Sequence, residues 1–489
     1  MQLLYGINVF KKIIKNKKDY TLKDYSFSGE GTAENPYNIE TIEDLVVLGN
    51  NVNNGKSYEK QYFILVNKLD FLDKSSYKNA ESKEYGDINR DGKVDDIITE
   101  LTTGMGFEPI GEENVFLGNF NGNGKIIKNY NVNLNELPQY NCIGIFGKNG
   151  GTISDLKVAG NINIIEKNTE TSLKIGLLCA ENTGILESCK VEGDINVDVR
   201  GTATEVAGIS AINTGNILNC VNNANIISNQ EMAGIVARSD SKENSNSEIT
   251  NCTNTGKIKE MSEIQNYAAG IVANNVGTLI TSCNNNGRVE GNLVGGIAGI
   301  STGKITACQN ASIVLNTSEE VNFERVAGGI VGQLEKNIVE NCKNTGEISG
   351  NTNIGGIAGK SSGEIVGTVN EGAISKESTI KDDFTNIGGI VGANQDKASI
   401  SDSKNYGNIS AETDNLVILG GICGLLYNNS LVENCENYGN LSGQANEIIP
   451  NEDLNDSCKS CLNFGGGTAQ SSDAGTLYLG LIYGKILIN

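Results

Sequence analysis

Oxygen-bearing side chains recur at alternate positions of the segment 86–96, GDINRDGKVDD. Asp87, Asn89 and Asp91 match positions 1, 3 and 5 of an EF-hand-type calcium loop, a glycine supplies the sharp turn at position 6, and Lys93 offers its backbone carbonyl at position 7. Calcium is a hard cation that prefers carboxylate and carbonyl oxygens. The spacing therefore predicts a Ca2+ ion that orders this segment rather than takes part in catalysis.

Position 12 of the loop departs from the calcium pattern, because Ile98 stands where a bidentate acid belongs. Asp95, Asp96 or Glu100 would have to supply that ligand, and the alternative is an acidic surface turn that binds no ion. The segment closely resembles the calcium loop of dockerin modules. The predicted metal ligands are Asp87, Asn89, Asp91, Lys93, Asp95 and Asp96.

The composition excludes several kinds of chemistry and partner. The chain contains no histidine, which rules out histidine-based hydrolase triads and HExxH zinc proteases. The net charge of −21 and the absence of an apolar run of roughly 20 residues argue against nucleic acid and membrane insertion. Acidic residues are scattered over the chain without a recurring cluster, so no catalytic pair can be selected. A β-helix enzyme that uses Asp, Lys and Arg remains an alternative.

Short repeats make up most of the chain. A glycine that precedes an aliphatic residue returns every 26 to 36 residues, and a last interval of 59 predicts one degenerate unit. This glycine column contains Gly144, Gly176, Gly208, Gly234, Gly270, Gly296, Gly329, Gly356, Gly389, Gly421 and Gly480.

Three further columns run through the second half of each unit. The thiol column contains Cys189, Cys220, Cys252, Cys283, Cys308, Cys342, Thr368, Ser403, Cys435 and Cys461. Three residues earlier lies an aliphatic column of Leu186, Ile217, Ile249, Ile280, Ile305, Val339, Ile365, Ile400, Val432 and, in its last unit, Cys458. Two residues after the thiol column lies the asparagine column of Asn222, Asn254, Asn285, Asn310, Asn344, Asn370, Asn405, Asn437 and Asn463.

Short β-branched segments broken by asparagine and glycine are typical of strands joined by tight turns. If each unit makes one coil, equal columns stack about 4.8 Å apart. Each asparagine is then expected to bond the backbone and the asparagine of the next coil, while the glycine beside it adopts a positive φ. The columns predict an all-β fold, a parallel β-helix of about ten or more coils.

The phrases GIFG, GGIAG and GGIVG resemble the GLUG repeats of bacterial surface proteins. The resemblance covers residues 144 to about 484, and the stretch 29–48, GEGTAENPYNIETIEDLVVL, resembles the opening coils of such proteins. It implies a right-handed β-solenoid on large secreted or surface-displayed proteins. GLUG repeats also occur beside the catalytic part of immunoglobulin A metalloproteases, but those enzymes need an HExxH motif that this chain lacks.

The twelve cysteines are predicted to be buried free thiols. Thr368 and Ser403 replace cysteine in the thiol column without a paired loss elsewhere, which argues against disulfides. The CKSC segment, with Cys458 and Cys461, looks like a redox motif or half of a zinc site, but both residues fall in columns of the core. A zinc site would need a second such pair or a histidine.

The chain is predicted to contain a basic leader (1–27), an N-terminal cap with the first coils (28–140) and GLUG-like repeats with a C-terminal closure (141–489), and the calcium-loop insertion spans 74–103. Thr41 and Asp44 form a capping box, which predicts a short helix over the open end of the first coil. Tyr406, Tyr438 and Phe464 share one column, which indicates either turn packing or a surface for a ligand or partner.

The function that we expect is that of a non-enzymatic β-solenoid, secreted or displayed on a bacterial surface, that serves as an adhesin or stalk. Its predicted partners are host-cell or cell-surface proteins or glycans, and self-association is a further option. The first residues place apolar side chains before lysines, the reverse of a secretion signal, so we expect no such signal in this chain. The alternatives are a tail fibre on a phage or bacteriocin particle and a polysaccharide-degrading β-helix enzyme.

Overall fold

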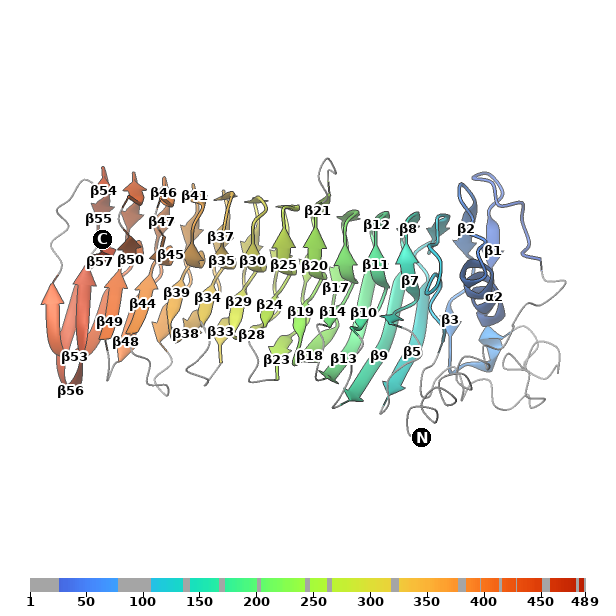
Figure 1. Cartoon of the computed structure of the whole chain (residues 1–489), viewed down its shortest axis with the longest axis horizontal. Coiled ribbons are helices and arrows are strands. Elements are labelled where there is room, and N and C mark those ends of the chain that lie inside the picture. The colour runs from blue at the N-terminus through green and yellow to red at the C-terminus, as the bar shows by residue number, and fades with distance from the viewer. Residues whose placement is uncertain are drawn as a thin grey trace, which may run out of the picture.

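The computed structural model describes residues 26–77, 107–134, 141–166, 172–199, 204–241, 247–261, 266–317, 325–376, 384–395, 397–412, 416–427, 429–450, 458–480 and 483–487. Over these ranges parallel strands follow one another around a long stack of coils and form three sheets of 14, 32 and 11 strands, here called sheets A, B and C (Figure 1). The predicted all-β parallel β-helix is confirmed.

Sheets A and C each receive one strand from a typical coil. Sheet A contains β1 (Tyr37–Ile39), β2 (Tyr62–Leu65), β4 (Asn119–Asn121), β8 (Thr152–Ser154), β12 (Ile185–Glu187), β16 (Asn216–Leu218), β21 (Glu248–Thr250), β26 (Leu279–Thr281), β31 (Ile305–Thr306), β36 (Ile338–Glu340), β41 (Glu364–Val366), β46 (Ser399–Ser401), β51 (Leu431–Glu433) and β54 (Cys458–Lys459). Sheet C contains β7 (Phe146–Asn149), β11 (Cys179–Asn182), β15 (Ser210–Asn213), β20 (Val236–Asp240), β25 (Val272–Val276), β30 (Ala298–Ser301), β35 (Val331–Leu334), β40 (Ala358–Ser361), β45 (Val391–Asn394), β50 (Cys423–Tyr427) and β57 (Tyr483–Leu487).

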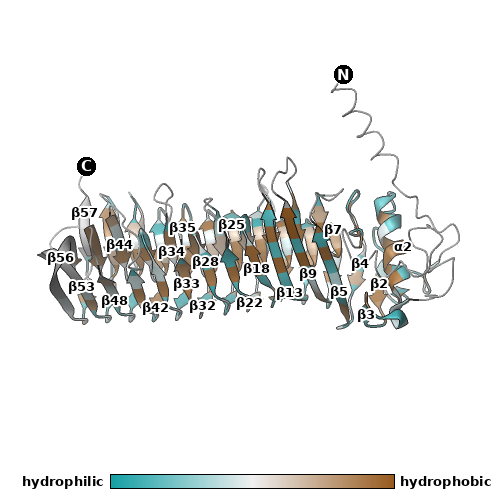
Figure 2. Cartoon of the chain, turned by 90° about the horizontal axis from the view of Figure 1, so that it is seen from below, coloured by the Kyte–Doolittle hydropathy of each residue, from teal (hydrophilic) through white to brown (hydrophobic). Residues whose placement is uncertain are grey.

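Sheet B receives up to three short strands from one coil, for example β37 (Lys343–Asn344), β38 (Ile348–Gly350) and β39 (Asn353–Gly355). Inward and outward side chains alternate along strands such as β13 (Lys190–Val199), and Figure 2 shows the resulting brown and teal stripes. The predicted aliphatic column is in register in sheet A from Leu186 to Cys458. Its aliphatic members are fully buried in one core that runs through the stack.

The asparagine column forms the predicted ladder. From Asn222 to Asn463, each side-chain Nδ2 donates to the Oδ1 of the next asparagine at 2.7–2.8 Å. Each Nδ2 also donates to the backbone carbonyl two residues further on, for example from Asn344 to Gly346 at 2.8 Å. The buried turn therefore keeps its polar groups paired, which is what such a turn requires.

The thiol column is also confirmed, and the eleven cysteines whose side chains are described, all but Cys458, are free. Ten of them are buried and Cys461 is half-buried. Backbone N–H groups contact sulfur in the next coil at 3.4 Å, as from Cys252 to Cys283 and from Cys283 to Cys308. Each thiol in turn faces a carbonyl of its own coil, as from Cys283 to Thr281 at 3.3 Å. Because these thiols are buried, the cysteines act as small core side chains.

The prediction that the glycine after each asparagine has positive φ is wrong. Gly287 and Gly346 are not among the residues with positive φ. They are needed for close approach instead, because a Cβ on Gly287 would lie 2.0 Å from the carbonyl oxygen of Gly256 in the preceding coil.

Positive φ occurs instead one residue before the thiol column, a position for which the sequence pattern predicts no special backbone. The φ angles are 51–56° at Asp155, Ser188, Asn219, Asn251, Ser282, Ala307, Asn341, Asp402, Asn434 and Ser460, and 62° at Gly367. Asparagine and aspartate tolerate this left-handed region better than most residues, which explains their frequency there.

The recurring glycine phrase marks a sharp bend between sheets B and C. A Cβ on Gly328 would lie 1.9 Å from the carbonyl oxygen of Val331, and one on Gly332 would lie 2.6 Å from that of Gly299 in the preceding coil. Alanine takes the place of Gly328 in three earlier coils, at Ala207, Ala233 and Ala269. The next position, that of Gly329, is glycine in every coil from Gly208 to Gly421, because a Cβ on Gly329 would lie 2.1 Å from the carbonyl oxygen of Gly356. The phrase recurs because each of these coils makes the same bend.

The predicted glycine column is out of register at both ends. Gly176 pairs with Ala207 rather than with Gly208, and Gly144 lies in that same shifted column. At the other end Gly480 pairs with Gly420 rather than with Gly421. The thiol column gives the correct register, because its side chains face the core, where a one-residue slip would turn them to the solvent.

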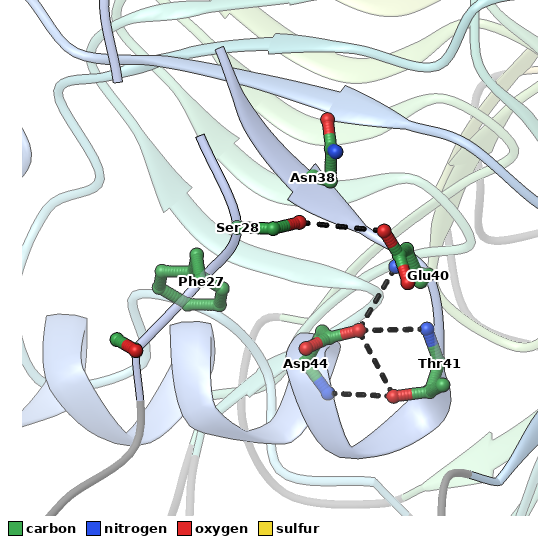
Figure 3. A pocket seen from close by; sticks show the side chains of 7 residues that line it. Phe27, Ser28, Asn38, Glu40, Thr41 and Asp44 are labelled. Carbon is green, nitrogen blue, oxygen red and sulfur yellow. Dashed lines mark hydrogen bonds between the residues drawn. The ribbon is translucent and has the colours of Figure 1, made fainter. Parts of the chain in front are cut away.

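The predicted capping helix is present as α2 (Ile42–Asn53), at the end of the stack that carries β1 (Figure 1). Thr41 Oγ1 accepts a hydrogen bond from the backbone N–H of Asp44 at 3.3 Å, and Asp44 Oδ2 accepts one from the backbone N–H of Thr41 at 2.8 Å (Figure 3). Leu45 and Leu48 lie in the core, so the apolar face of the helix covers the first coils.

The interval of 59 residues contains the predicted degenerate unit. Sheet A gains β54 and sheet B gains β55 (Leu462–Asn463), but sheet C passes directly from β50 to β57. Strand β56 (Gly467–Gly480) then pairs with both β49 (Leu416–Gly420) and β53 (Leu441–Pro450). The final segment thus provides closing strands, as expected.

Candidate functional site

The predicted calcium ligands Asp87, Asn89, Asp91, Lys93, Asp95 and Asp96 lie outside the described residues, as do most of the basic leader and of the insertion 74–103. The calcium ion and these boundaries therefore stay predictions. Among the described residues there is no group of three or more cysteine or acidic side chains that could hold a metal ion. No helix in the described ranges is long and apolar enough to cross a membrane.

A pocket of about 290 Å³ lies beside the start of α2 and is lined by residues that include Ser28, Glu40 and Asp44 (Figure 3). Its polar groups are engaged with one another. Ser28 Oγ donates to Glu40 Oε1 at 3.3 Å, and the backbone N–H of Glu40 donates to Asp44 Oδ2 at 2.9 Å. The pocket belongs to the cap of the helix, and nothing in it points to a ligand.

The predicted aromatic column forms a stack of three parallel rings, which we call the aromatic ladder. The ring centroids of Tyr406 and Tyr438 lie 4.7 Å apart, and those of Tyr438 and Phe464 lie 4.8 Å apart. The three residues pack against one another yet remain exposed, by 45%, 37% and 60% in chain order. The rings therefore pack against one another, as the turn-packing interpretation predicts, and they also remain exposed to solvent.

A second cluster of polar groups lies where sheets B and C meet, on the outer face of the bend. It is built from the first residues of β14 (Glu205–Ala207), β19 (Glu231–Ala233) and β24 (Tyr267–Ala269), which are stacked in successive coils. Their neighbours Val206, Met232 and Ala268 point into the core, so Glu205, Glu231 and Tyr267 point outward. We call this cluster the carboxylate seam.

Sheet C supplies the other side of the carboxylate seam through Arg238 and Asn274, which are paired in register. Asn274 lowers the pKa of the Glu231 carboxyl group, and Arg238 Nε pairs with Asp240 Oδ2 at 3.1 Å. Tyr267 packs on a small apolar floor formed by Ala233, Ala269 and Ala273. The seam therefore combines carboxylates, an amide, a guanidinium and an aromatic ring on one surface.

The surroundings of Glu205 and Glu231 disfavour the ionised form of both carboxyl groups. Burial and the negative charge of Glu231 raise the pKa of Glu205 to about 7, against the lowering effect of Lys174 and Arg238. Burial also raises the pKa of Glu231, although Asn274 and Arg238 act in the opposite direction. Lys174 is engaged by Glu181 in the same coil. At neutral pH Glu205 is consequently poised between its protonated and ionised forms.

The carboxylate seam is not among the sites predicted from the sequence. Its signal is the residue three positions before the glycine of the phrase, in EVAG, EMAG and YAAG, where Glu205, Glu231 and Tyr267 stand. In later units the same position in sheet B is occupied by Leu293 and Val326. Acidic residues at one position of only two neighbouring coils do not stand out in a linear sequence, although stacking places them side by side.

The comparisons with known proteins are sparse. No family model matches the chain. A stretch of 154 residues is 27% identical to Halomucin of Haloquadratum walsbyi, which covers 30% of this chain and 1% of that protein. A crystal structure of an immunoglobulin A1 protease candidate from Bacteroides ovatus aligns over 90% of this chain and 86% of that one, with 14% identity and a TM-score of 0.26. The chain thus spans a very small part of its curated relative, and neither match assigns an activity.

Proposed function

We propose that this chain is a non-enzymatic β-solenoid, secreted or displayed on a cell surface, that recognises glycans through the carboxylate seam. The observation that carries the proposal is the grouping of Glu231, Asn274, Arg238 and Tyr267 on one outward face. Hydroxyl groups of a sugar bind carboxylate, amide and guanidinium groups, while the apolar face of a sugar ring packs on an aromatic ring.

The stack itself is suited to a stalk that carries such a site. Fourteen parallel strands in sheet A, at about 4.8 Å each, span about 60 Å. Parallel strands pair from coil to coil along all three sheets, so the site is held on a rigid support. The GLUG-like phrases add support, since that resemblance implies a surface-displayed solenoid.

The proposal is tested by binding of the purified chain to an array of neutral and acidic glycans. We expect binding to at least one glycan class, with at least tenfold loss of affinity in Glu231→Gln and in Tyr267→Ser. Glu364→Gln serves as the matched control, because Glu364 is an exposed acid on sheet A, away from the seam. Binding that is absent from the parent chain, or equal in all variants, would contradict glycan recognition at this site.

A polysaccharide-degrading enzyme is the second candidate, and one specific observation favours it. Glu205 and Glu231 are neighbouring carboxyl groups, and burial raises the pKa of Glu205 to about 7, so that one group can stay protonated while the other is ionised. Release of reducing ends or of unsaturated products from a bound glycan, abolished by Glu205→Gln, would identify an enzyme. Binding without product release would support the adhesin.

A further inference from the structure

The outward side chains change from charged to apolar at β55, the strand that pairs with β52 (Glu436–Asn437). Two coils earlier the outward pair is Lys404 and Tyr406, and one coil earlier it is Glu436 and Tyr438, with Lys404 Nζ and Glu436 Oε2 2.7 Å apart. At β55 the charged position is taken by Leu462, which is 51% exposed, beside Phe464. Together with the rest of the aromatic ladder, these side chains form a contiguous exposed apolar patch, and such patches mark interaction sites.

The aromatic ladder is open on one side at Phe464. The ring of Tyr438 is stacked between those of Tyr406 and Phe464. Within the described part of the chain, the ring of Phe464 stacks on Tyr438 alone. One ring face is thus available at the spacing of the next coil.

The asparagine ladder is open at the same place. Asn437 donates through Nδ2 both to Gly439 and to Asn463, and its backbone carbonyl accepts from the N–H of Phe464 at 2.7 Å. Asn463 repeats only the first of these bonds, to Gly465 at 2.8 Å. In the described residues its second Nδ2 hydrogen has no acceptor and its backbone carbonyl has no donor. Both groups point toward the position of a further coil.

Edge strands usually carry charges that prevent pairing with another chain. β55 presents Leu462 instead, and Phe464 follows it directly, whereas the neighbouring edge strand β54 carries Lys459. Lys459 pairs in register with Glu433 of the coil before. A strand that continued these columns with an acid over Lys459 would therefore meet a complementary charge. The edge formed by β54 and β55 therefore favours a strand with an acid in the column of Lys459 and an aromatic residue in the column of Phe464.

We propose that β54 and β55 form a docking site for a parallel strand of a partner protein. The partner places an asparagine over Asn463, an aromatic ring over Phe464 and an acid over Lys459, so that it lengthens the ladders by one coil. Parallel addition excludes a second copy of this chain as the equivalent occupant, because helix α2 covers the opposite end of the stack. This is strand addition to a sheet edge, with backbone bonds for affinity and side-chain columns for specificity.

The probe is a fluorescent peptide with the sequence of residues 430–443, SLVENCENYGNLSG, which carries all three features, with Cys435→Ser to prevent disulfide formation. Binding is measured by fluorescence anisotropy on the full chain. We expect saturable binding that weakens at least tenfold in Phe464→Ser and in Leu462→Glu, which places a like charge opposite Glu436 of the peptide. We also expect at least tenfold weaker binding of a peptide that has Asn437→Ser and Tyr438→Ser in addition. Tyr406→Ser in the full chain is the matched control and leaves the affinity unchanged, because Tyr406 lies two coils away from the edge.

The substituted side chains are exposed, so circular dichroism and melting temperature should match the parent and show that any loss is local. No binding to the parent chain, or equal binding of the altered peptide, would overturn the proposal. Sedimentation of the chain alone should show a monomer at micromolar concentration. A dimer that disappears in Phe464→Ser would identify a second copy as the occupant and would likewise overturn the partner-strand proposal.

Discussion

Thr368 and Ser403, the two residues that replace cysteine in the thiol column, lie in adjacent coils with their hydroxyl oxygens 3.0 Å apart. Both are fully buried. Ser403 Oγ also accepts from the backbone N–H of Thr368 at 3.1 Å and donates to the carbonyl of Ser401 at 2.8 Å. The two hydroxyl groups therefore satisfy each other, and the column tolerates them because they occur as neighbours.

This pairing predicts that Ser403→Ala destabilises the chain more than an exposed serine substitution does. The change leaves the N–H and hydroxyl of Thr368 without a partner in a dry site, at a cost of about 1–3 kcal/mol in the free energy of unfolding. The double variant Thr368→Cys with Ser403→Cys restores a continuous thiol column and should recover most of that loss. Denaturant unfolding measures both, with the exposed Ser362→Ala as control. Additive effects of Thr368→Cys and Ser403→Cys would contradict the coupling.

The features that could be predicted from the sequence are those that repeat at the same position of successive coils. The aliphatic, thiol and asparagine columns were predictable because each repeats one side-chain type at a buried position where a slip of register is costly. The glycine column misled at its ends because GIFG and GGIVG align by letter, although Gly176 pairs with Ala207.

Other features depend on contacts between residues far apart in the chain. A second ladder, in which Asn149 donates to Asn182 and Asn182 to Asn213 at 2.8 Å, was not predictable because serine or leucine interrupts the asparagines of this column in later coils. The carboxylate seam needs Glu231 of sheet B beside Asn274 of sheet C, and no motif within a single unit links them. The calcium segment follows a local spacing rule and lies outside the described residues.

The asparagine ladder predicts a large effect of Asn344→Ala. Asn344 accepts from Asn310 at 2.7 Å and donates to Asn370 and to the carbonyl of Gly346, each at 2.8 Å, and it is fully buried. Loss of the side chain leaves several buried groups unpaired, so we expect about 3 kcal/mol or more of destabilisation. Thr345→Ala, at the next and half-exposed position, should change the unfolding free energy by less than about 1 kcal/mol. Similar effects of the two changes would show that the ladder contributes little.

The bend between sheets B and C predicts that Gly329→Ala is not tolerated. The added Cβ would lie 2.1 Å from the carbonyl oxygen of Gly356 in the next coil, so the backbone would have to move in two coils. We expect about 3 kcal/mol or more of destabilisation, or an insoluble product. Gly466→Ala is the matched control, because its Cβ would meet only the side chain of Asn440, at 3.3 Å. A soluble Gly329→Ala variant with the melting temperature of the parent would refute the close-approach account of the phrase.

The segment 86–96 predicts calcium uptake by the full chain. Calorimetric titration should show one site of millimolar or tighter affinity, because the loop supplies several oxygen ligands at the spacing of a calcium loop. Asp87→Ala removes the ligand at position 1 and should abolish the heat of binding. Asp402→Ala, an acidic residue of a distant turn, should leave it unchanged. Absence of uptake by the parent chain would favour the acidic surface turn.

Buried carboxyl groups predict that the free energy of unfolding falls as the pH rises from about 4.3 to about 8. Glu260 is only 6% exposed, and burial raises its pKa to about 8 although the backbone N–H of Asn292 donates to its Oε2 at 2.7 Å. Unfolded glutamate has a pKa of about 4.3, so between about pH 4.3 and 8 the folded chain retains a proton that the unfolded chain has lost. Stability is greatest below this range and falls as pH rises, by up to about 1.4 kcal/mol per pH unit for one group.

Glu205 acts in the same direction, since its pKa is raised to about 7. Denaturant unfolding at pH 5, 6, 7 and 8 should therefore give steadily lower unfolding free energies for the parent chain. Glu260→Gln keeps a neutral hydrogen-bonding side chain at the buried position and should flatten this decline between pH 5 and 8. The exposed Glu364→Gln should leave the slope unchanged. A parent chain whose stability does not fall over this range would show that water reaches these carboxyl groups and that their ionisation is not opposed by burial.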